Sequence, residues 1–321
     1  MDGALTLRTG RRLGRQRLQD AAFRATTRLF AAGVLVLLGG IIVALAVEAV
    51  PAFSTYGWGF LVSDAWNPVK KNFGALPAIY GTLVTSAIAM VIGIPLAFGI
   101  AVFLTELCPP PLRRPIGVLI ELLAAVPSII YGIWGLFVLA PFLQLTVQPL
   151  LVSTLGELPV IGALFAGPPL GLGVLTAGII LGFMVLPFIA SVMRDIFLTV
   201  PPMLRESAYG VGATTAEVVR HVVLPFTRVG VVGAIMLGLG RALGETMAVT
   251  FVIGNAHRIK PSLLAPGTTI SATLANEFTE AVGDLYTSSL FALGFILFAI
   301  TFIVLAAAKL MLIRLQQRAA T

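Results

Sequence analysis

The chain has 321 residues, of which 58% are hydrophobic and only 11% are charged, and its mean hydropathy is +1.01. Soluble domains carry about 25% charged residues, so a soluble fold of this composition would expose large apolar patches. The composition excludes a soluble globular domain and predicts an all-α integral membrane protein. The single cysteine, Cys108, excludes an intrachain disulfide and a multi-cysteine metal site.

Apolar segments of about 20 residues are long enough to cross a bilayer. The sequence contains six such segments, which predict transmembrane helices over approximately Leu29–Val50, Ile79–Leu104, Ile116–Phe142, Leu172–Met193, Val229–Ile253 and Leu290–Leu312. Residues 29–321 are therefore expected to form the membrane domain. Residues 1–28 are rich in arginine and are expected to be a basic cytoplasmic segment, either an interfacial helix or a disordered tail. The first apolar run is longer than that of a secretory signal, so we expect it to be retained.

The net charge of +7 could indicate nucleic-acid binding, but most of the Lys and Arg residues flank the expected spans. The segments on the same side as the N-terminus hold most of them. The segments on the other side hold only Lys70, Lys71, Arg258 and Lys260. By the positive-inside rule, both termini are expected in the cytoplasm. We expect a multi-pass protein of the inner or plasma membrane that contacts lipid and binds no nucleic acid.

Residues 194–228 are the most polar internal segment. Two adjacent prolines can open a short helix there, which Gly210 and Gly212 would end. Thr214 and Glu217 have the spacing of a capping box, which predicts the start of a second helix. The sequence thus predicts a helix–turn–helix elbow that projects from the membrane on the cytoplasmic side.

The elbow resembles the E-A-A-x3-G-x9-I-x-L-P motif of ABC importer permeases. The matching residues are Glu206, Ala208, Gly212, Leu224 and Pro225. Ser207 replaces the first alanine of the motif and Val222 the isoleucine, and both substitutions are small. The resemblance implies that the elbow contacts an ATPase subunit, with Ala208 and Gly212 permitting close approach and Glu206 pairing with a basic group. The alternative is an ordinary cytoplasmic loop whose glycines serve turns. Pro225 is expected to end or bend the second helix.

Arg241 and Glu245 lie in the fifth expected span at a spacing that, on a continuous helix, puts both on one face as a pair. A central Arg costs about 2.5–3.5 kcal/mol on insertion scales and is by default a functional residue. We expect Arg241 to contact an oxyanion and Glu245 to neutralise and orient it when the anion is absent. The alternative is a pair that only locks helix packing. Gly240 and Gly244 form a small-residue edge that another helix could approach closely.

Several stretches resemble the PstC-type permease subunits of ABC phosphate importers. They are GLGRALGETMAV with the following IGN, and the segments Phe73–Ser86, Leu104–Pro115 and Ile120–Phe142. The resemblance implies a six-helix type I ABC importer permease that moves inorganic phosphate into the cytoplasm, with Arg241 and Glu245 in the pathway. The implied partners are a homologous PstA-type permease, two PstB-type ATP-binding subunits that hold ATP and Mg²⁺, and an extracytoplasmic PstS-type phosphate-binding protein.

Neither GxxxxGKS nor GxxxxGKT occurs in the sequence, so we expect no cofactor, metal or catalytic site on this chain and ATP hydrolysis on the partner subunits. The near alternatives are the paired phosphate permease or a permease for sulfate or molybdate. A secondary transporter or channel would show related halves, which are not visible. A membrane-embedded enzyme would need a cluster of reactive polar residues at a membrane face.

Three further expectations concern two glutamates and the last outer connection. Glu121 is expected to pair with Arg113 or Arg114, or to line the pathway. Glu106, at an inner helix end, is expected to be solvated. The outer connection 254–289 is expected to be partly helical.

Overall fold

The computed structural model describes residues 3–159 and 161–320, and the side chains of residues 3–18 and 315–320 lie outside the described residues. Among the described residues, six helical segments are long and apolar enough to cross a membrane: Gln19–Tyr56, Leu76–Leu107, Ser128–Leu155, Val174–Leu198, Thr215–Leu243 and Asp284–Arg314. The predicted all-α membrane architecture with six spans is confirmed.

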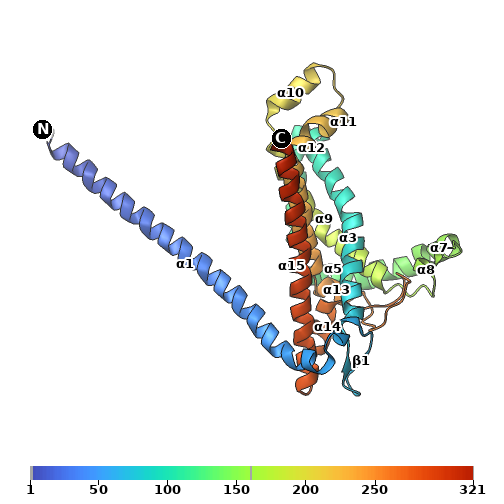
Figure 1. Cartoon of the computed structure of the whole chain (residues 1–321). Helices are drawn as coiled ribbons and strands as arrows, with labels where there is room; N and C mark the ends of the chain where they lie inside the picture. Colours follow the sequence, from blue (N-terminus) through green and yellow to red (C-terminus); the bar gives the residue numbers. More distant parts are fainter. Residues whose placement is uncertain (1–2, 160, 321) are drawn as a thin grey trace. The chain divides into compact units, whose positions relative to one another are not determined.

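The spans are built largely from α-helices (Figure 1). The α-helices are α1 (Gly3–Tyr56), α2 (Gly59–Val62), α3 (Leu76–Val102), α4 (Pro110–Ala124), α5 (Ser128–Trp134), α6 (Ala140–Phe142), α7 (Gln148–Leu155), α8 (Gly162–Phe165), α9 (Val174–Leu198), α10 (Pro202–Gly210), α11 (Thr215–Val218), α12 (Leu224–Leu243), α13 (Met247–Thr250), α14 (Ile270–Glu277) and α15 (Asp284–Ala320). The π-helical segments are η1 (Phe103–Leu107), η2 (Gly135–Leu139), η3 (Leu143–Val147) and η4 (Val219–Val223), and the strands are β1 (Trp66–Asn67) and β2 (Asn72–Phe73).

The chain divides into two compact units, Met1–Glu48 and Ala49–Thr321. In the first unit, α1 is continuous, and the described side chains from residue 19 to residue 41 are all exposed. An apolar helix with exposed side chains is suited to contact with lipid. Most of the arginines behind the expected interfacial role of residues 1–28 lie between residues 8 and 17, and their side chains lie outside the described residues. The expected domain boundary after residue 28 remains a prediction.

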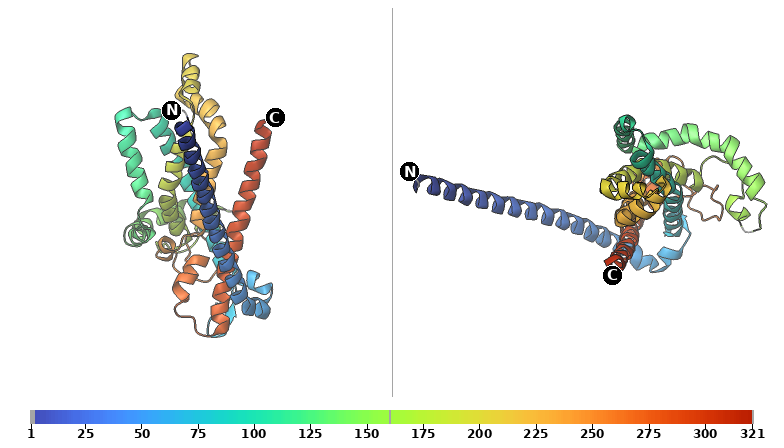
Figure 2. Two further views of the ribbon diagram at one scale, coloured as in Figure 1. Left: turned by 90° about the vertical axis from the view of Figure 1, so that its left-hand side faces the viewer. Right: turned by 90° about the horizontal axis from the view of Figure 1, so that it is seen from above.

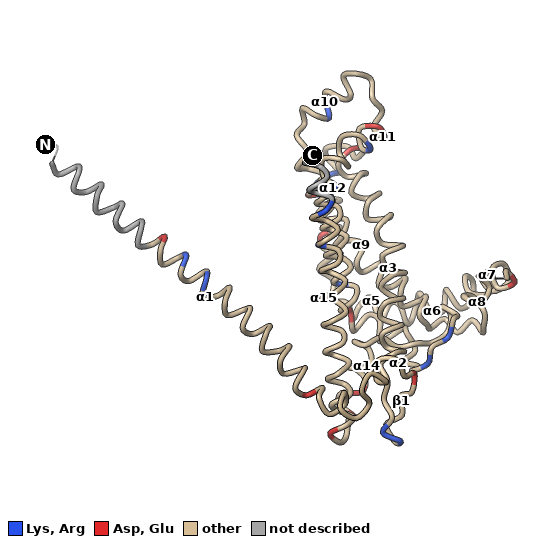
Figure 3. Tube along the Cα trace, viewed as in Figure 1, with Lys and Arg blue, Asp and Glu red and all other residues tan. Residues whose placement is uncertain are grey.

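In the second unit, α10 and α11 lie at one end of α3, α9 and α12, here termed the elbow end (Figures 1 and 2). The hairpin β1–β2 and helix α14 lie at the opposite end. The two strands are antiparallel, and Trp66 lies opposite Phe73. The fold therefore separates the elbow from the outer connections by the length of the membrane helices, with charged residues near both ends (Figure 3).

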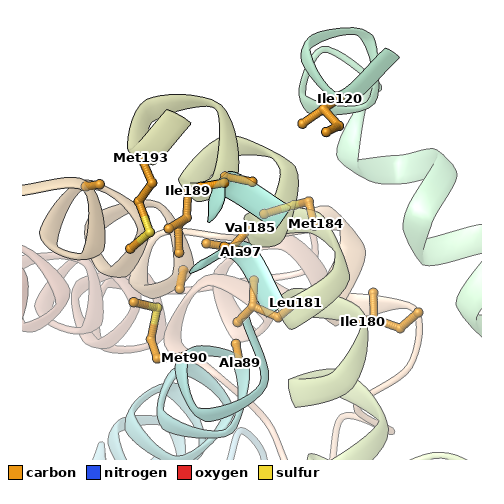
Figure 4. Close-up of a cluster of buried hydrophobic side chains, with 14 of the residues drawn as sticks. Ala89, Met90, Ala97, Ile120, Ile180, Leu181, Met184, Val185, Ile189 and Met193 are labelled. Carbon is orange, nitrogen blue, oxygen red and sulfur yellow. The ribbon is translucent and has the colours of Figure 1, made fainter. Parts of the chain in front are cut away.

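The core of the second unit lies where α3 and α9 cross (Figure 4). Ala89 and Ala97 of α3 belong to one buried cluster with Leu181 and Ile189 of α9. A Cβ atom added at Gly182 would lie 3.4 Å from the carbonyl oxygen of Ala89, so the two backbones approach closely. Small residues at a membrane helix crossing permit such an approach and gain van der Waals contact in return.

The third span differs from the prediction. It covers Ser128–Leu155 rather than Ile116–Phe142, and α4 is a separate helix that ends at Ala124. Pro127 is the reason, because proline has no backbone N–H and disfavours helical geometry at the residue before it. The helix therefore stops before Pro127 and α5 begins directly after it.

Candidate functional site

The fifth span is interrupted where the sequence predicts a continuous helix. Helix α12 ends at Leu243, and the short helix α13 begins only at Met247. The Glu245 carboxylate, through Oε1, accepts a hydrogen bond from the backbone N–H of Ala248 at 3.2 Å. Glu245 thus satisfies a backbone N–H donor at the start of α13. A negatively charged side chain is favourable at a helix N-terminus.

The expected ion pair between Arg241 and Glu245 is absent from the described residues. Residues four apart share a face only on an unbroken helix, and the break after Leu243 puts Glu245 outside α12. Arg241 is exposed, and its Cζ lies 5.6 Å from the centroid of the Phe188 ring of α9. This cation–π contact holds the guanidinium beside α9. Non-helical backbone at membrane depth is tolerated where it is buried in protein or lines a water-filled cavity.

The small-residue edge of Gly240 and Gly244 lines a cavity of about 640 Å³ against α15. A Cβ atom at Gly240 would lie 3.6 Å from the Leu305 side chain, an ordinary van der Waals distance. At Gly244 the nearest atom would be the carbonyl oxygen of Gly240 at 3.8 Å. Neither glycine is pressed against a neighbouring helix within the described part of the chain, so their role in helix packing remains a prediction.

The elbow has the local structure that its sequence predicts. Pro201 precedes α10, and Gly212 turns the chain with a φ of +88°, a conformation that favours glycine. Thr214 and Glu217 form a complete capping box: Thr214 Oγ1 accepts from the N–H of Glu217, and the Glu217 carboxylate accepts from the N–H of Thr214. The two helices and their glycine turn therefore form as expected.

Pro225 is expected to end or bend the second helix, but the helix does not end there. The helical segment runs from Thr215 to Leu243, and Pro225 is the second residue of α12. Inside a continuous helix, proline lacks the N–H that would make a backbone hydrogen bond at its position. The π-helical segment η4 directly before it changes the hydrogen-bond register, so the helix continues into the membrane.

The motif residues of the elbow differ in exposure. The exposed ones are Glu206, Ser207, Gly212 and Pro225, and the half-buried ones are Ala208, Val222 and Leu224. The Ser207 hydroxyl donates to the carbonyl oxygen of Met203 at 2.7 Å, a bond within α10. Helix α10 buries none of its side chains within the chain. The exposed surface of the elbow is therefore available to another protein.

Arg205 connects α10 to two other elements, a role that the sequence does not reveal. Its Nη2 donates to the carbonyl oxygen of Phe197 at 2.6 Å, and its Nε lies 3.2 Å from Oε1 of Glu106 in an ion pair. The expectation that Glu106 is solvated is wrong, because its side chain is only 4% exposed. The motif leaves position 205 undefined, and Glu106 lies in a different span, so no local spacing could indicate the pair.

Glu121 has a different partner from the expected ones. Its Oε1 accepts from Nη2 of Arg194 at 2.6 Å, whereas Arg113 donates through Nε to the carbonyl oxygen of Cys108 at 2.8 Å. The predicted pairing with Arg113 or Arg114 is therefore wrong. Arg194 lies at the elbow end of α9, beside α4, and its position relative to Glu121 depends on how the two helices cross.

A polar cluster lies at the opposite end, where 254–289 is partly helical as expected. The carboxylate of Glu277 accepts from Trp66 Nε1 at 2.6 Å and the Tyr286 hydroxyl at 2.8 Å, and it pairs with His257 Nε2 at 2.7 Å. Burial raises the pKa of Glu277, but the hydrogen bonds from His257, Tyr286 and Trp66 outweigh it and hold the pKa below 4.5. The cluster joins β1, the loop after α13, α14 and α15.

Comparison with known proteins identifies the family. The model of the family described as binding-protein-dependent transport system inner membrane component matches residues 93–317. The phosphate transport system permease protein PstC of Mesorhizobium japonicum is 65% identical over 94% of this chain and 92% of its own. The chain belongs to the PstC family of transport permeases. Within this family, PstC of Pasteurella multocida is 54% identical over 93% of this chain and 93% of its own.

Solved structures show the same permease fold. The bacterial alginate ABC transporter in complex with its alginate-bound periplasmic protein matches with a TM-score of 0.60 at 18% identity, covering 92% of this chain and 96% of that chain. The inward-facing MetNI methionine ABC transporter matches with a TM-score of 0.53 at 17% identity, covering 75% and 94%. The expected ABC importer permease fold is confirmed, and the chain is a multi-pass membrane subunit of a transport system.

Proposed function

We propose that this PstC-family permease moves inorganic phosphate into the cytoplasm as one membrane subunit of an ATP-driven importer. The observation that carries the proposal is the 65% identity, over 94% of this chain, to a protein described as a phosphate transport system permease. The exposed Arg241 near the break in the fifth span supports it, because an intramembrane cation is costly and is retained where it has a function.

Arg241 is the proposed contact for phosphate in the pathway. Its planar guanidinium can donate two parallel hydrogen bonds to two oxygens of one phosphate, which a lysine cannot do. Phe188 lies beside the guanidinium, and Arg241 forms no hydrogen bond or ion pair among the described residues, so its N–H donors are free to meet an anion. Glu245 is assigned to the same pathway: it stabilises the start of α13, and its negative charge keeps phosphate from binding too tightly to pass on.

The elbow is the proposed docking site for an ATPase subunit. Met203 and Val211 are 76% and 87% exposed on and after α10, and exposed apolar side chains of this kind are typical of a protein interface. Glu206 and Ser207 lie beside them and supply polar contacts. Motion of the ATPase would pass through Arg205 to Glu106 and the end of the second span, and directly through the continuous helical segment from Thr215 to Leu243.

The proposed complex contains this chain, a homologous PstA-type permease, two PstB-type subunits and a PstS-type binding protein. ATP and Mg²⁺ would bind to the PstB-type subunits, and ATP hydrolysis would take place there. We propose that the elbow end and both termini face the cytoplasm, because basic residues gather in the segments of that side. Phosphate would then arrive from the binding protein at the opposite end, where β1 and α14 lie.

Uptake by vesicles tests the proposal. The complete complex with its binding protein is reconstituted, and ATP-dependent entry of labelled phosphate is measured with sulfate or molybdate as competitor. We expect uptake that requires ATP and the ATPase subunits and that neither competitor reduces. Competition by sulfate or molybdate would indicate a permease for another oxyanion. Uptake without ATP would indicate a secondary transporter.

A further inference from the structure

Two cavities follow each other along the seam between α4 and α9. The first, about 360 Å³, lies at the elbow end and is lined by Arg113, Arg114, Glu121, Arg194 and three apolar residues. The second, about 420 Å³, is lined by apolar and aromatic side chains of α3, α4, α5 and α9. They are termed here the polar cavity and the apolar cavity. Both have volumes within the range of about 300–1,000 Å³ that is typical of ligand pockets.

The polar cavity has the charge and geometry of a site for a phosphate group. Arg194 is neutralised by Glu121 at 2.6 Å and by Asp195 at 2.8 Å. Arg113 uses its Nε for the carbonyl oxygen of Cys108 and keeps its other N–H groups, and Arg114 forms no hydrogen bond or ion pair among the described residues. The lining therefore has surplus positive charge, and arginine forks match phosphate oxygens.

Arg194 is held in this cavity by the shape of α4. A Cβ atom at Gly117 would lie 2.3 Å from Nη1 of Arg194, so the guanidinium lies directly against the backbone of α4. Together with the ion pair between Arg194 and Glu121, this contact joins α4 to α9 at the polar cavity. The cavity is therefore a built feature of the helix crossing rather than a loose cluster of surface arginines.

The apolar cavity indicates that the ligand also has an apolar part. On α9, Pro187 lines the apolar cavity and Arg194 the polar one, and seven helical residues correspond to about 10 Å along the axis. Leu119 and Leu122 are exposed on α4 beside the seam, as expected of a helix that faces lipid. A free phosphate ion would use only the polar cavity, whereas an amphiphile with an anionic head and an apolar chain would fill both.

We propose that this seam binds an anionic phospholipid, with its phosphate group at Arg113 and Arg114 and an acyl chain in the apolar cavity. Basic pockets between membrane helices on the cytoplasmic side bind the head groups of anionic lipids elsewhere. The inference depends on the proposed orientation only in assigning the lipid to the cytoplasmic leaflet. Because the bound lipid holds α4 against α9, it stabilises the span arrangement next to the elbow.

Lipid retention by the whole complex tests the proposal. The complete importer is purified from nanodiscs of phosphatidylglycerol and phosphatidylcholine, and native mass spectrometry measures the phosphatidylglycerol that stays bound. We expect the double variant R113Q/R114Q to bind about tenfold less, since it loses charged hydrogen bonds to the phosphate group. The matched control is R228Q, which removes an exposed arginine of α12 that lines neither cavity and should retain lipid as the wild type does.

Three outcomes are decisive. Equal retention by R113Q/R114Q and wild type, with both complexes intact, would overturn the proposal. Displacement of the bound lipid by inorganic phosphate would also overturn it and assign the polar cavity to free phosphate. The proposal would be supported if lipid retention falls in R113Q/R114Q and also falls in the separate variant L123W, in which a bulky side chain fills the apolar cavity. Since lipid retention requires no transport, this result is independent of phosphate uptake.

Discussion

Arg205 of the elbow helix α10 and Glu106 at the end of the second span form an ion pair, with Nε and Oε1 3.2 Å apart. Arg205 also donates to the carbonyl oxygens of Phe197 and Val200, so one side chain connects the elbow to two membrane helices. The Glu106 side chain is 4% exposed, and removing one partner of such a pair leaves an uncompensated buried charge.

Replacing one partner of this pair is expected to uncouple the transporter. Arg205→Met should destabilise the junction by about 3–5 kcal/mol and lower the amount of phosphate imported per ATP hydrolysed. The ratio of uptake to hydrolysis in vesicles measures this effect. The double variant E106Q/R205M should recover part of the stability, since it removes both charges. A normal ratio in Arg205→Met would show that the elbow transmits motion by another route.

The glycine turn of the elbow offers a matched pair of substitutions. A Cβ atom at Gly212 or Gly210 would meet nothing within 4 Å, but only Gly212 has a positive φ, +88°. Gly212→Ala should therefore cost about 1–2 kcal/mol in the turn, whereas Gly210→Ala should be neutral or stabilising for α10. We expect weaker co-purification of the ATPase with Gly212→Ala alone. Equal co-purification of the two variants would make Gly212 irrelevant to docking.

The cluster around Glu277 predicts a stability that depends on pH. Its pKa is lowered in the folded chain despite the opposing effect of burial, so it binds protons less readily than in the unfolded chain. Its contribution to stability is thus complete above the ordinary pKa of 4.5 and is lost as the pH falls through the lower, folded value. Thermal unfolding of the complex from neutral pH to below 4.5 measures this. Glu277→Gln should lack this part of the decline, and an unchanged pH profile would contradict the assignment.

Local sequence signals predicted much of the fold. Hydropathy gave the six spans, and the Thr214–Glu217 spacing gave the capping box that the structure contains. Both depend on residues close together in the chain. The start of the third span was misplaced because hydropathy continues through Pro127, whereas the backbone does not.

The polar contacts of the site were harder to predict. The partner of Glu121 is Arg194 and that of Glu106 is Arg205, and both pairs join residues of different helices. Only the crossing of the helices brings these residues together, and the spacing of residues in a single sequence does not show how helices cross. The Arg241–Glu245 pair failed for another reason: helical spacing predicts a shared face only if the helix is unbroken, and α12 ends at Leu243.

Arg241 is proposed to contact phosphate on its way through the membrane. The most direct measurement is ATP-dependent uptake of labelled phosphate by vesicles that contain the complex with Arg241→Ala, next to wild type and Arg241→Lys. We predict that Arg241→Ala assembles normally but loses uptake, and that Arg241→Lys recovers only a small part, because lysine lacks the guanidinium fork. Uptake at the wild-type rate by an intact Arg241→Ala complex would contradict the account.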